Sequence, residues 1–193
     1  MVSFYDSFMV LFEKRFLRKA RQSILSKASG RVLEIGGGTG LNLMQYHFDI
    51  IDSLIITDID IDKRLIKRVQ KHPHQDKIKI NETSVENLSF PDASFDTVIF
   101  TLVFCTVTDV NQGLQEIKRV LKDNGRLLFI EHIHPRKKSL RTIFNWINPV
   151  WKKISSGCNL NRDIKTSLEE NGFTIGEYQY LTKQIFVGGC AKK

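Results

Sequence analysis

The sequence is poor in cysteine. Its three cysteines, Cys105, Cys158 and Cys190, are an odd number in 193 residues, and no two of them form a CxxC pair. Disulfide-stapled domains and thiolate zinc modules are typically recognised by even or closely spaced cysteines. We therefore expect neither a disulfide framework nor a metal site, and we expect a reducing compartment.

The sequence also lacks a long hydrophobic run. No apolar stretch approaches the roughly 18 residues that a membrane-spanning helix needs. Asp6 precedes the apolar part of the amino terminus, which has neither a basic leader nor a small-residue cleavage site. We therefore expect no secretory signal and a cytoplasmic location. Because no repeat, low-complexity tract or linker divides the chain, we expect a single domain over residues 1–193.

Positive charge is in excess. The formal net charge is +8, and the basic residues are interrupted by acids and apolar residues. Such a charge would suit a nucleic acid or an anionic lipid, but solvated helix faces explain most patterns of this kind. The charge alone therefore selects no partner.

Aromatic residues form a stripe near the amino terminus. Phe4, Phe8, Phe12 and Phe16 recur every four residues, which places them on one side of a helix. We expect residues 1–29 to form a helical segment. Its stripe has three interpretations: it packs in the core, covers an apolar site as a lid, or lies on a membrane surface beside its basic neighbours.

After Gly30, short strand-like runs alternate with amphipathic helical stretches. This alternation predicts an α/β fold with a parallel sheet and helices on both faces. The last two runs are separated only by "TKQ", which is too short for a crossover, so they should pair antiparallel. We predict a Rossmann-like, doubly wound, seven-stranded sheet over residues 30–193, in a three-layer sandwich. The strand-like runs are "RVLEI", "SLIITDI", "KIKINET", "TVIFTL", "GRLLFIEHI", "FTIGEYQYL" and "QIFVGGCA".

Two helices between these strands have clear patterns. They are "DKRLIKRVQK" and "GLQEIKRVLK", and the glycine of "DNG", residues 123–125, is expected to cap the second of them. A further helix is expected from Leu41, directly after a glycine-rich turn.

That turn is the most informative motif, "VLEIGGGTG", from Val32 to Gly40. In doubly wound sheets the first strand-to-helix turn usually contacts the ligand. The dinucleotide fingerprint GxGxxG does not fit, because position 41 is leucine, and the phosphate loop does not fit, because the chain contains no Gly-Lys pair. The pattern that remains is ExGxGxG, from Glu34 to Gly40.

This pattern resembles the first motif of the class I S-adenosylmethionine-dependent methyltransferases with a type 11 methyltransferase domain, and the resemblance extends from Arg31 over nearly the whole chain. It implies S-adenosylmethionine as the cofactor. An acid at the end of the second strand would then bind the ribose hydroxyls. Asp60 and Asp58 compete for this position, and we prefer Asp60 because Ile59 is then the last buried strand residue.

The segment "TSVENLSFPDASFDTVIF" resembles the family's adenine loop and fourth strand. Many relatives carry an acid where this chain has Ser84, whose hydroxyl would replace it, and Val85 would pack on the ring. The resemblance implies a set of cofactor contacts. They are Glu34, Gly36, Gly37, Gly38, Gly40, Asp60, Ile61, Ser84, Val85 and Thr101.

A closer resemblance lies in "FTLVFCTV", "FIEHI" and "NPVWKKISSGCNLNR". Together these segments resemble the methyltransferase-like seven family, whose characterised animal members methylate alkyl thiols. Similar bacterial chains are often grouped with phospholipid or quinone methyltransferases. The implied acceptor is a small or lipophilic molecule: an alkyl thiol, a phospholipid amine or a quinone. The animal proteins carry a hydrophobic anchor ahead of the domain, where this chain has its phenylalanine stripe, so we expect peripheral membrane association at most.

Residues at the ends of the fourth and fifth strands are candidates for the acceptor side. His132 is the candidate for a base or a substrate-orienting group, and Cys105 and Cys158 are expected to be packed hydrophobes rather than nucleophiles. A metal site built from Glu131, His132 and His134 is not expected. Arg162 is either an anion contact or an ion-pair partner at a helix start. The acceptor-side candidates are Tyr5, Phe104, Cys105 and Arg162.

Two rival functions remain. An RNA methyltransferase would use the positive charge, but the fourth strand ends in "TLVFCTV" rather than in an Asn/Asp-Pro-Pro-aromatic loop. Nucleic acid is therefore not the expected partner. A protein that binds S-adenosylmethionine without turnover is the other alternative. The sequence predicts no oligomeric state.

Overall fold

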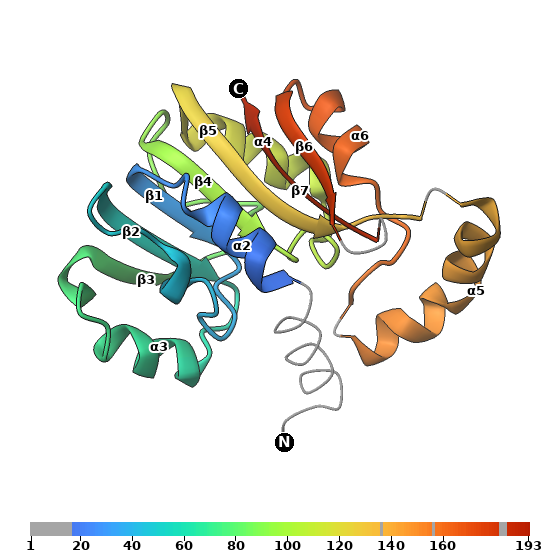
Figure 1. The fold of residues 1–193 in the computed structure, drawn as a ribbon, viewed down its shortest axis with the longest axis horizontal. Coiled ribbons are helices and arrows are strands. Elements are labelled where there is room, and N and C mark those ends of the chain that lie inside the picture. The colour runs from blue at the N-terminus through green and yellow to red at the C-terminus, as the bar shows by residue number, and fades with distance from the viewer. Residues whose placement is uncertain (1–16, 136, 156, 182–184) are drawn as a thin grey trace.

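The computed structural model describes residues 17–135, 137–155, 157–181 and 185–193. They build one seven-stranded sheet in the order β3-β2-β1-β4-β5-β7-β6 (Figure 1). The strands β1 to β5 pair in parallel, whereas β7 pairs antiparallel with both β5 and β6. This confirms the predicted fold class. The strands are β1 (Gly30–Ile35), β2 (Ile51–Asp58), β3 (Ile78–Glu82), β4 (Phe95–Thr101), β5 (Leu121–His132), β6 (Thr174–Leu181) and β7 (Phe186–Lys192).

Helices cover both faces of the sheet. Residues of α4 and α6 share a hydrophobic core with one face, and residues of α2 and α3 share a second core with the other face. Helix α5 stands away from these three layers (Figure 1). No helix in the described part of the chain is both long and apolar enough to cross a membrane. The helices are α2 (Arg18–Leu25), α3 (Lys63–Gln70), α4 (Val110–Val120), α5 (Lys138–Ile154) and α6 (Ile164–Glu170), with short 3-10 turns η2 (Leu43–Gln45) and η3 (Gln75–Lys77).

The helix expected from Leu41 is absent, and this prediction was wrong. The chain makes only the 3-10 turn η2 before it turns back toward β2. The reason lies in two polar side chains at its ends. Asn42 and Tyr46 are both buried and both donate hydrogen bonds to the carboxylate of Glu34. These tertiary bonds fix an irregular backbone that local helix propensity does not predict.

Strand β2 ends earlier than expected. Its last residue is Asp58, and Ile59 is 73% exposed instead of being the last buried strand residue. The next helix, α3, begins at Lys63, because the carboxylate of Asp62 accepts a hydrogen bond from the backbone N–H of Arg64 as a helix cap. The loop between strand and cap is therefore longer at its start, and the predicted register at this strand end was wrong.

The boundary between α4 and β5 also differs from the expectation. Helix α4 ends at Val120, and residues 123–125 already belong to β5, so Gly125 caps no helix. Leu121 is fully buried and pairs with Phe95, and a register shift between this pair and the next accommodates the extra strand residues. Burial of Leu121 thus outweighs the turn signal of "DNG".

Candidate functional site

A cavity of about 340 Å³ lies where β1, β2 and β4 end. This is the position in which open α/β sheets bind their ligands, and the volume is at the lower end of ordinary ligand sites. The glycine turn, the end of β2, the loop after β3 and the loop after β4 all contribute to its wall. The lining residues are Ile35, Gly36, Gly38, Asp58, Ile59, Thr83, Ser84, Val85, Glu86, Leu102, Val103, Thr106, Val107 and Thr108.

The glycine turn needs glycine for two different reasons. At Gly36, with φ of +71°, a Cβ would lie 2.3 Å from Cγ2 of Val103, so the position is closed by packing. At Gly38, with φ of +49°, a Cβ would meet no atom within 4 Å. The backbone at Gly38 is therefore open to the cavity, and a ligand can approach it directly. Gly37 and Gly40 belong to the same turn but do not line the cavity.

The carboxylate beside this turn is Asp58, not Asp60. One oxygen of Asp58 accepts a hydrogen bond from the backbone N–H of Gly38 at 2.7 Å, and the other accepts from the N–H of Ile59 at 2.8 Å. Asp58 lines the cavity, whereas Asp60 and Ile61 do not. The preference for Asp60 depended on Ile59 being the last buried residue of β2. Because β2 ends at Asp58 and Ile59 is exposed, Asp60 lies beyond the residues that line the cavity.

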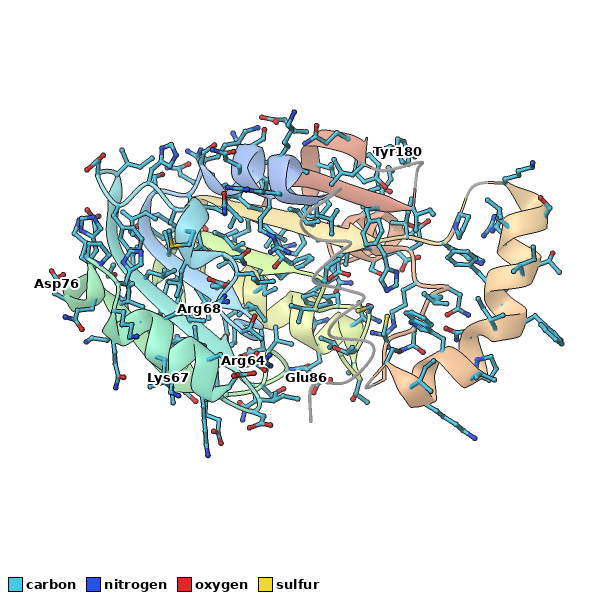
Figure 2. The ribbon with its side chains drawn as sticks, turned by 60° about the horizontal axis from the view of Figure 1, so that its bottom comes forward. Arg64, Lys67, Arg68, Asp76, Glu86 and Tyr180 are labelled. Carbon is cyan, nitrogen blue, oxygen red and sulfur yellow. The ribbon has the colours of Figure 1, made fainter. Side chains whose placement is uncertain are left out.

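The loop after β3 supplies the opposite wall. Ser84 and Val85 line the cavity as expected, and Val85 also packs into the core. Sequence reasoning missed Glu86, which lines the cavity as well and is labelled in Figure 2. The hydroxyl of Ser84 donates to a carboxylate oxygen of Glu86 at 3.3 Å. An acid is thus present on this wall, two residues after the position where the family pattern places it.

Glu34 lies below the cavity and does not line it. Its carboxylate is 1% exposed and accepts hydrogen bonds from Asn42 at 2.7 Å and from Tyr46 at 2.8 Å. Burial raises the pKa of Glu34 to about 7, although both hydrogen bonds oppose this shift. The hydroxyl of Thr101 accepts from Asn42 and from Arg21 of α2. Glu34 and Thr101 therefore hold the segment that follows the glycine turn, through Asn42 and Tyr46.

The acceptor-side candidates gather at a second, smaller cavity of about 70 Å³. Phe104, Cys105, His132 and Arg162 all line it, together with the buried carboxyl of Glu131. The guanidinium of Arg162 donates to the backbone carbonyls of Phe104 and Val107 and so holds the loop after β4, and its expected role as an anion contact stays a prediction. Tyr5 lies outside the described residues.

Two of the three cysteines meet beside His132. Nε2 of His132 lies 3.0 Å from Sγ of Cys158, and the ligand atoms of Cys105, His132 and Cys158 all lie within 4.8 Å of one another. The hydrogen bond between the two thiols lowers the pKa of Cys158 and raises that of Cys105. All three side chains are buried. Sequence spacing gave no signal for this cluster, because 53 residues separate the cysteines along the chain.

His134 is not part of this cluster. Its Nδ1 accepts a hydrogen bond from Nε of Arg141 at 3.3 Å, beyond the end of β5. Glu131 instead turns inward, where its Oε1 accepts from the backbone N–H groups of Val103 and Phe104. Burial raises the pKa of Glu131 to about 7. The carboxylate thereby fixes the loop that separates the two cavities.

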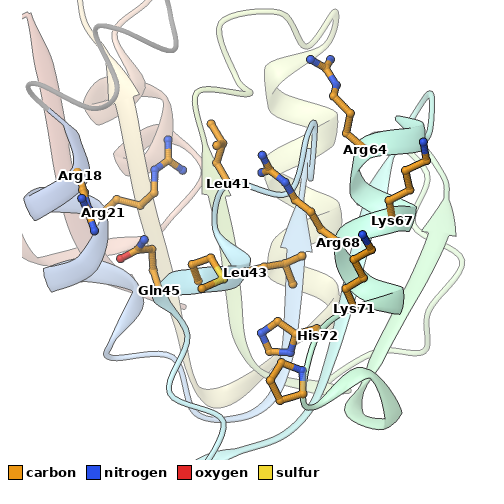
Figure 3. Close-up of a pocket in the computed structure, with 12 residues that line it drawn as sticks. Arg18, Arg21, Leu41, Leu43, Gln45, Arg64, Lys67, Arg68, Lys71 and His72 are labelled. Carbon is orange, nitrogen blue, oxygen red and sulfur yellow. The ribbon is translucent and has the colours of Figure 1, made fainter.

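A larger cavity of about 850 Å³ lies elsewhere, between α2, η2 and α3 (Figure 3). Basic side chains from both helices surround apolar residues of the η2 segment. Among the residues that the structure describes, none of those predicted from the sequence as site residues lines it. Its size therefore does not identify it as the reaction site. The basic residues are Arg18, Arg21, Arg64, Lys67, Arg68 and Lys71.

Comparison with known proteins places this geometry in context. A model of the family described as "Methyltransferase domain" matches residues 33–129. Thiol S-methyltransferase TMT1B of Rattus norvegicus is 32% identical over 74% of this chain and 59% of its own length. Thiol S-methyltransferase TMT1A of Homo sapiens is 28% identical over 92% of this chain and 77% of its own length.

More distant similarities agree with the fold. The ubiquinone/menaquinone biosynthesis C-methyltransferase UbiE of Geobacter sulfurreducens is 29% identical over 69% of this chain and 54% of its own length. The crystal structure of geranyl diphosphate C-methyltransferase from Streptomyces coelicolor, in complex with S-adenosyl-L-homocysteine, superposes with a TM-score of 0.71 at 14% identity, covering 91% of this chain and 77% of that chain. The chain spans about six tenths of the length of the rat relative.

Proposed function

The chain belongs to the methyltransferase domain family, and from this premise we propose that it transfers a methyl group from S-adenosylmethionine to a small acceptor, with an alkyl thiol as the preferred class. The observation that carries the proposal is the cavity at the ends of β1, β2 and β4, with the open backbone of Gly38 on one side and the carboxylate of Asp58 beside it.

The residues of this cavity fit the cofactor. Each carboxylate oxygen of Asp58 accepts one hydrogen bond within the protein and keeps a lone pair for a ribose hydroxyl. Ser84, Val85 and Glu86 offer a hydroxyl, an apolar surface and an acid for the adenine. The open backbone at Gly38 leaves room for the methionine portion. Glu34 and Thr101 do not line the cavity and would act indirectly, by holding the segment after the glycine turn.

Methyl transfer depends mainly on how the protein positions the acceptor and the methyl group. The bound cofactor would supply an activated methyl group on a sulfonium, and transfer is an in-line displacement at one carbon. Holding the reactants in line can contribute roughly 7 to 11 kcal/mol of the barrier. Val103 and Thr106 line the cavity on the side of the loop that leads to Phe104 and Cys105. This loop would place the acceptor against the methyl group.

The choice of a thiol rests on the names of the relatives and on the acceptor side. Two relatives that are 28% and 32% identical are named thiol S-methyltransferases. A thiol reacts as its thiolate, which a nearby base or positive charge favours. His132 lines the acceptor-side cavity, and its role as a base or orienting group stays a prediction from the sequence.

The experiment that tests the function measures S-adenosylhomocysteine released from labelled cofactor. A simple alkyl thiol, phosphatidylethanolamine vesicles, a short-chain quinol and RNA are offered in parallel to the full chain, and binding of S-adenosylhomocysteine is measured by calorimetry. We expect turnover on the thiol. Turnover on the lipid or quinol alone would contradict the thiol as acceptor but would leave the proposed methyl transfer standing. Cofactor binding without turnover on any acceptor, RNA included, would support the non-catalytic alternative.

A further inference from the structure

We propose that Cys105, His132 and Cys158 form a binding site for one zinc ion. The three side chains come from three separate segments: the loop after β4, the last residue of β5, and the segment that follows α5. Cys105 and His132 line the small acceptor-side cavity, and Cys158 lies beside both of them. Nothing in the fold or in the proposed methyl transfer requires two thiols and an imidazole to meet there.

The distances suit a single metal ion. Tetrahedral zinc with Zn–S bonds of about 2.3 Å and Zn–N bonds of about 2.0 to 2.1 Å holds its ligand atoms about 3.5 to 3.8 Å apart. The two Sγ atoms and the imidazole nitrogen lie within 4.8 Å of one another, and Nε2 of His132 already lies 3.0 Å from Sγ of Cys158. Shifts of under about 1 Å would bring all three atoms to bonding distance.

The ligands sit on backbone that is fixed in advance. Asn159, next to Cys158, donates both its backbone N–H and its side-chain amide to the carbonyl of Cys105, each at 2.9 Å. His132 is held in the sheet, where it pairs with Phe186 of β7. A metal site needs this kind of support, because ordering ligand residues on mobile loops costs free energy and so lowers the affinity for the metal.

Charge and donor type select zinc. Two thiolates and a neutral imidazole balance the two charges of the ion, so the buried site carries no net charge. Sulfur and imidazole donors favour zinc over magnesium or calcium, which prefer oxygen ligands. The adjacent cavity of about 70 Å³ leaves space for a fourth ligand such as water. Three protein ligands with one open position are the pattern of zinc sites that take part in chemistry rather than only in folding.

This site changes what His132 can do. With Nε2 on a metal, His132 is a ligand and takes no proton from the acceptor through that atom. The expected role of His132 as a base and the zinc site are therefore exclusive, and metal content distinguishes them. The site itself does not depend on the proposed transferase activity.

The test measures metal bound by the full chain without a histidine tag. The protein is reduced with a phosphine, incubated with Zn²⁺, freed of excess metal by gel filtration and analysed by mass spectrometry. Replacement of zinc by Co²⁺ provides a second readout, because thiolate ligands give an intense near-ultraviolet charge-transfer band and tetrahedral geometry gives strong visible bands. We expect about one zinc per chain and both cobalt signatures.

Variants decide whether the named residues are the ligands. We expect Cys105→Ser, Cys158→Ser and His132→Ala each to weaken zinc binding at least about tenfold in a chelator competition and to remove or shift the cobalt bands. Cys190→Ser is the matched control, because Cys190 lies on β7 outside the cluster, and it should bind zinc as the wild type does. Circular dichroism checks that each variant is folded.

Three results would overturn the proposal. One is a folded, reduced wild-type chain that retains well under one zinc. Another is zinc binding that Cys105→Ser and Cys158→Ser both leave unchanged. The third is a Cys105–Cys158 disulfide that persists after reduction and blocks metal binding. S-adenosylhomocysteine binding, measured on the same samples, separates failure of the zinc site from failure of the proposed function.

Discussion

At the scale of single residues, Asp58 connects the end of β2 to the glycine turn. Its carboxylate accepts from Gly38 and from Ile59, and it still faces the cavity. Asp60, two residues later, lies outside the cavity lining. The two acids are near neighbours in the sequence, yet only Asp58 lines the cavity, which makes them a matched pair for experiment.

We expect Asp58→Ala to weaken binding of S-adenosylhomocysteine by more than tenfold. A hydrogen bond to a charged group contributes about 1.5 to 3 kcal/mol, and the variant also frees the N–H of Gly38. Calorimetric titration measures the affinity. Asp60→Ala is the control and should change it less than about threefold, since an exposed acid outside the site contributes little. A larger loss in Asp60→Ala than in Asp58→Ala would instead assign the cofactor contact to Asp60.

Glu34 makes stability depend on pH. Its pKa is about 7 in the folded chain and 4.5 without burial, so near pH 6 the folded state holds a proton that the unfolded chain releases. The stability linked to this proton is fully present below about pH 4.5 and is lost as pH rises to about 7. The full contribution of this proton to the free energy of unfolding is about 3 kcal/mol.

We therefore expect the free energy of unfolding of the wild type to fall more steeply between about pH 5 and pH 7.5 than that of Glu34→Gln, which cannot ionise. Urea denaturation at a series of pH values measures both curves, and the difference between them isolates Glu34. Parallel curves would mean that Glu34 is ionised in the folded chain throughout this range.

At the scale of elements, the sequence predicted what depends on local pattern. The alternation of strands and helices and the short "TKQ" connection were enough for the mixed sheet with its antiparallel end. Elements set by tertiary contacts were missed: the side chain of Asn42 reaches Glu34 and prevents a helix after the glycine turn, and buried Leu121 draws "DNG" into β5. Neither contact can be predicted from local propensity.

The same limit applies to the candidate site. The glycine turn and the Ser84 wall were found because they are contiguous motifs, whereas the acid that lines the cavity could be identified only from the observed end of β2. The cluster of Cys105, His132 and Cys158 joins residues that are up to 53 positions apart. Only the packing of the loop after β4 against the segment after α5 reveals it.

The glycine turn gives a prediction at this scale. Gly38→Ala should lower the free energy of unfolding by only about 1 to 2 kcal/mol, the cost of a left-handed alanine, because its Cβ meets open space. It should nevertheless weaken S-adenosylhomocysteine binding by more than tenfold, since the Cβ occupies the space left for the ligand. Urea denaturation and calorimetry measure the two effects.

Gly36→Ala provides the contrast. Its Cβ would lie 2.3 Å from Cγ2 of Val103, so this variant should lose clearly more stability than Gly38→Ala. If Gly38→Ala bound the cofactor product normally, the open backbone at Gly38 would not be the ligand contact, and the proposed placement of the cofactor would fail.

At the scale of the whole molecule, the net charge is +8, and the basic side chains gather in particular places. One group of basic side chains surrounds the basic cavity between α2 and α3 (Figure 3). Another group lies on α5, where Arg141, Lys152 and Lys153 accompany exposed apolar side chains. The phenylalanine stripe, for which membrane contact was one of three interpretations of the sequence, lies outside the described residues. Helix α5 offers a second basic and apolar surface.

We expect this surface of α5 to bind bilayers that contain an anionic phospholipid. Trp146 is 84% exposed and Val150 is 65% exposed, on a helix that stands away from the sheet (Figure 1). Aromatic burial at an interface and attraction of basic residues to anionic lipid both favour docking. The double variant Trp146→Ser/Val150→Ser should reduce the partition coefficient in a vesicle sedimentation assay at least about tenfold.

The control for this prediction is Ile50→Ser. Ile50 is 50% exposed but lies just before β2, at the amino-terminal ends of the parallel strands and thus opposite the candidate cavity, so its replacement should leave vesicle binding unchanged. Added salt should weaken the binding of the wild type, because the basic residues of α5 act over a Debye length of about 10 Å at 0.1 M ionic strength. Binding that survives the α5 double variant would assign the membrane contact to another surface, with the basic cavity of α2 and α3 the next to test by charge reversal at Lys67 and Lys71.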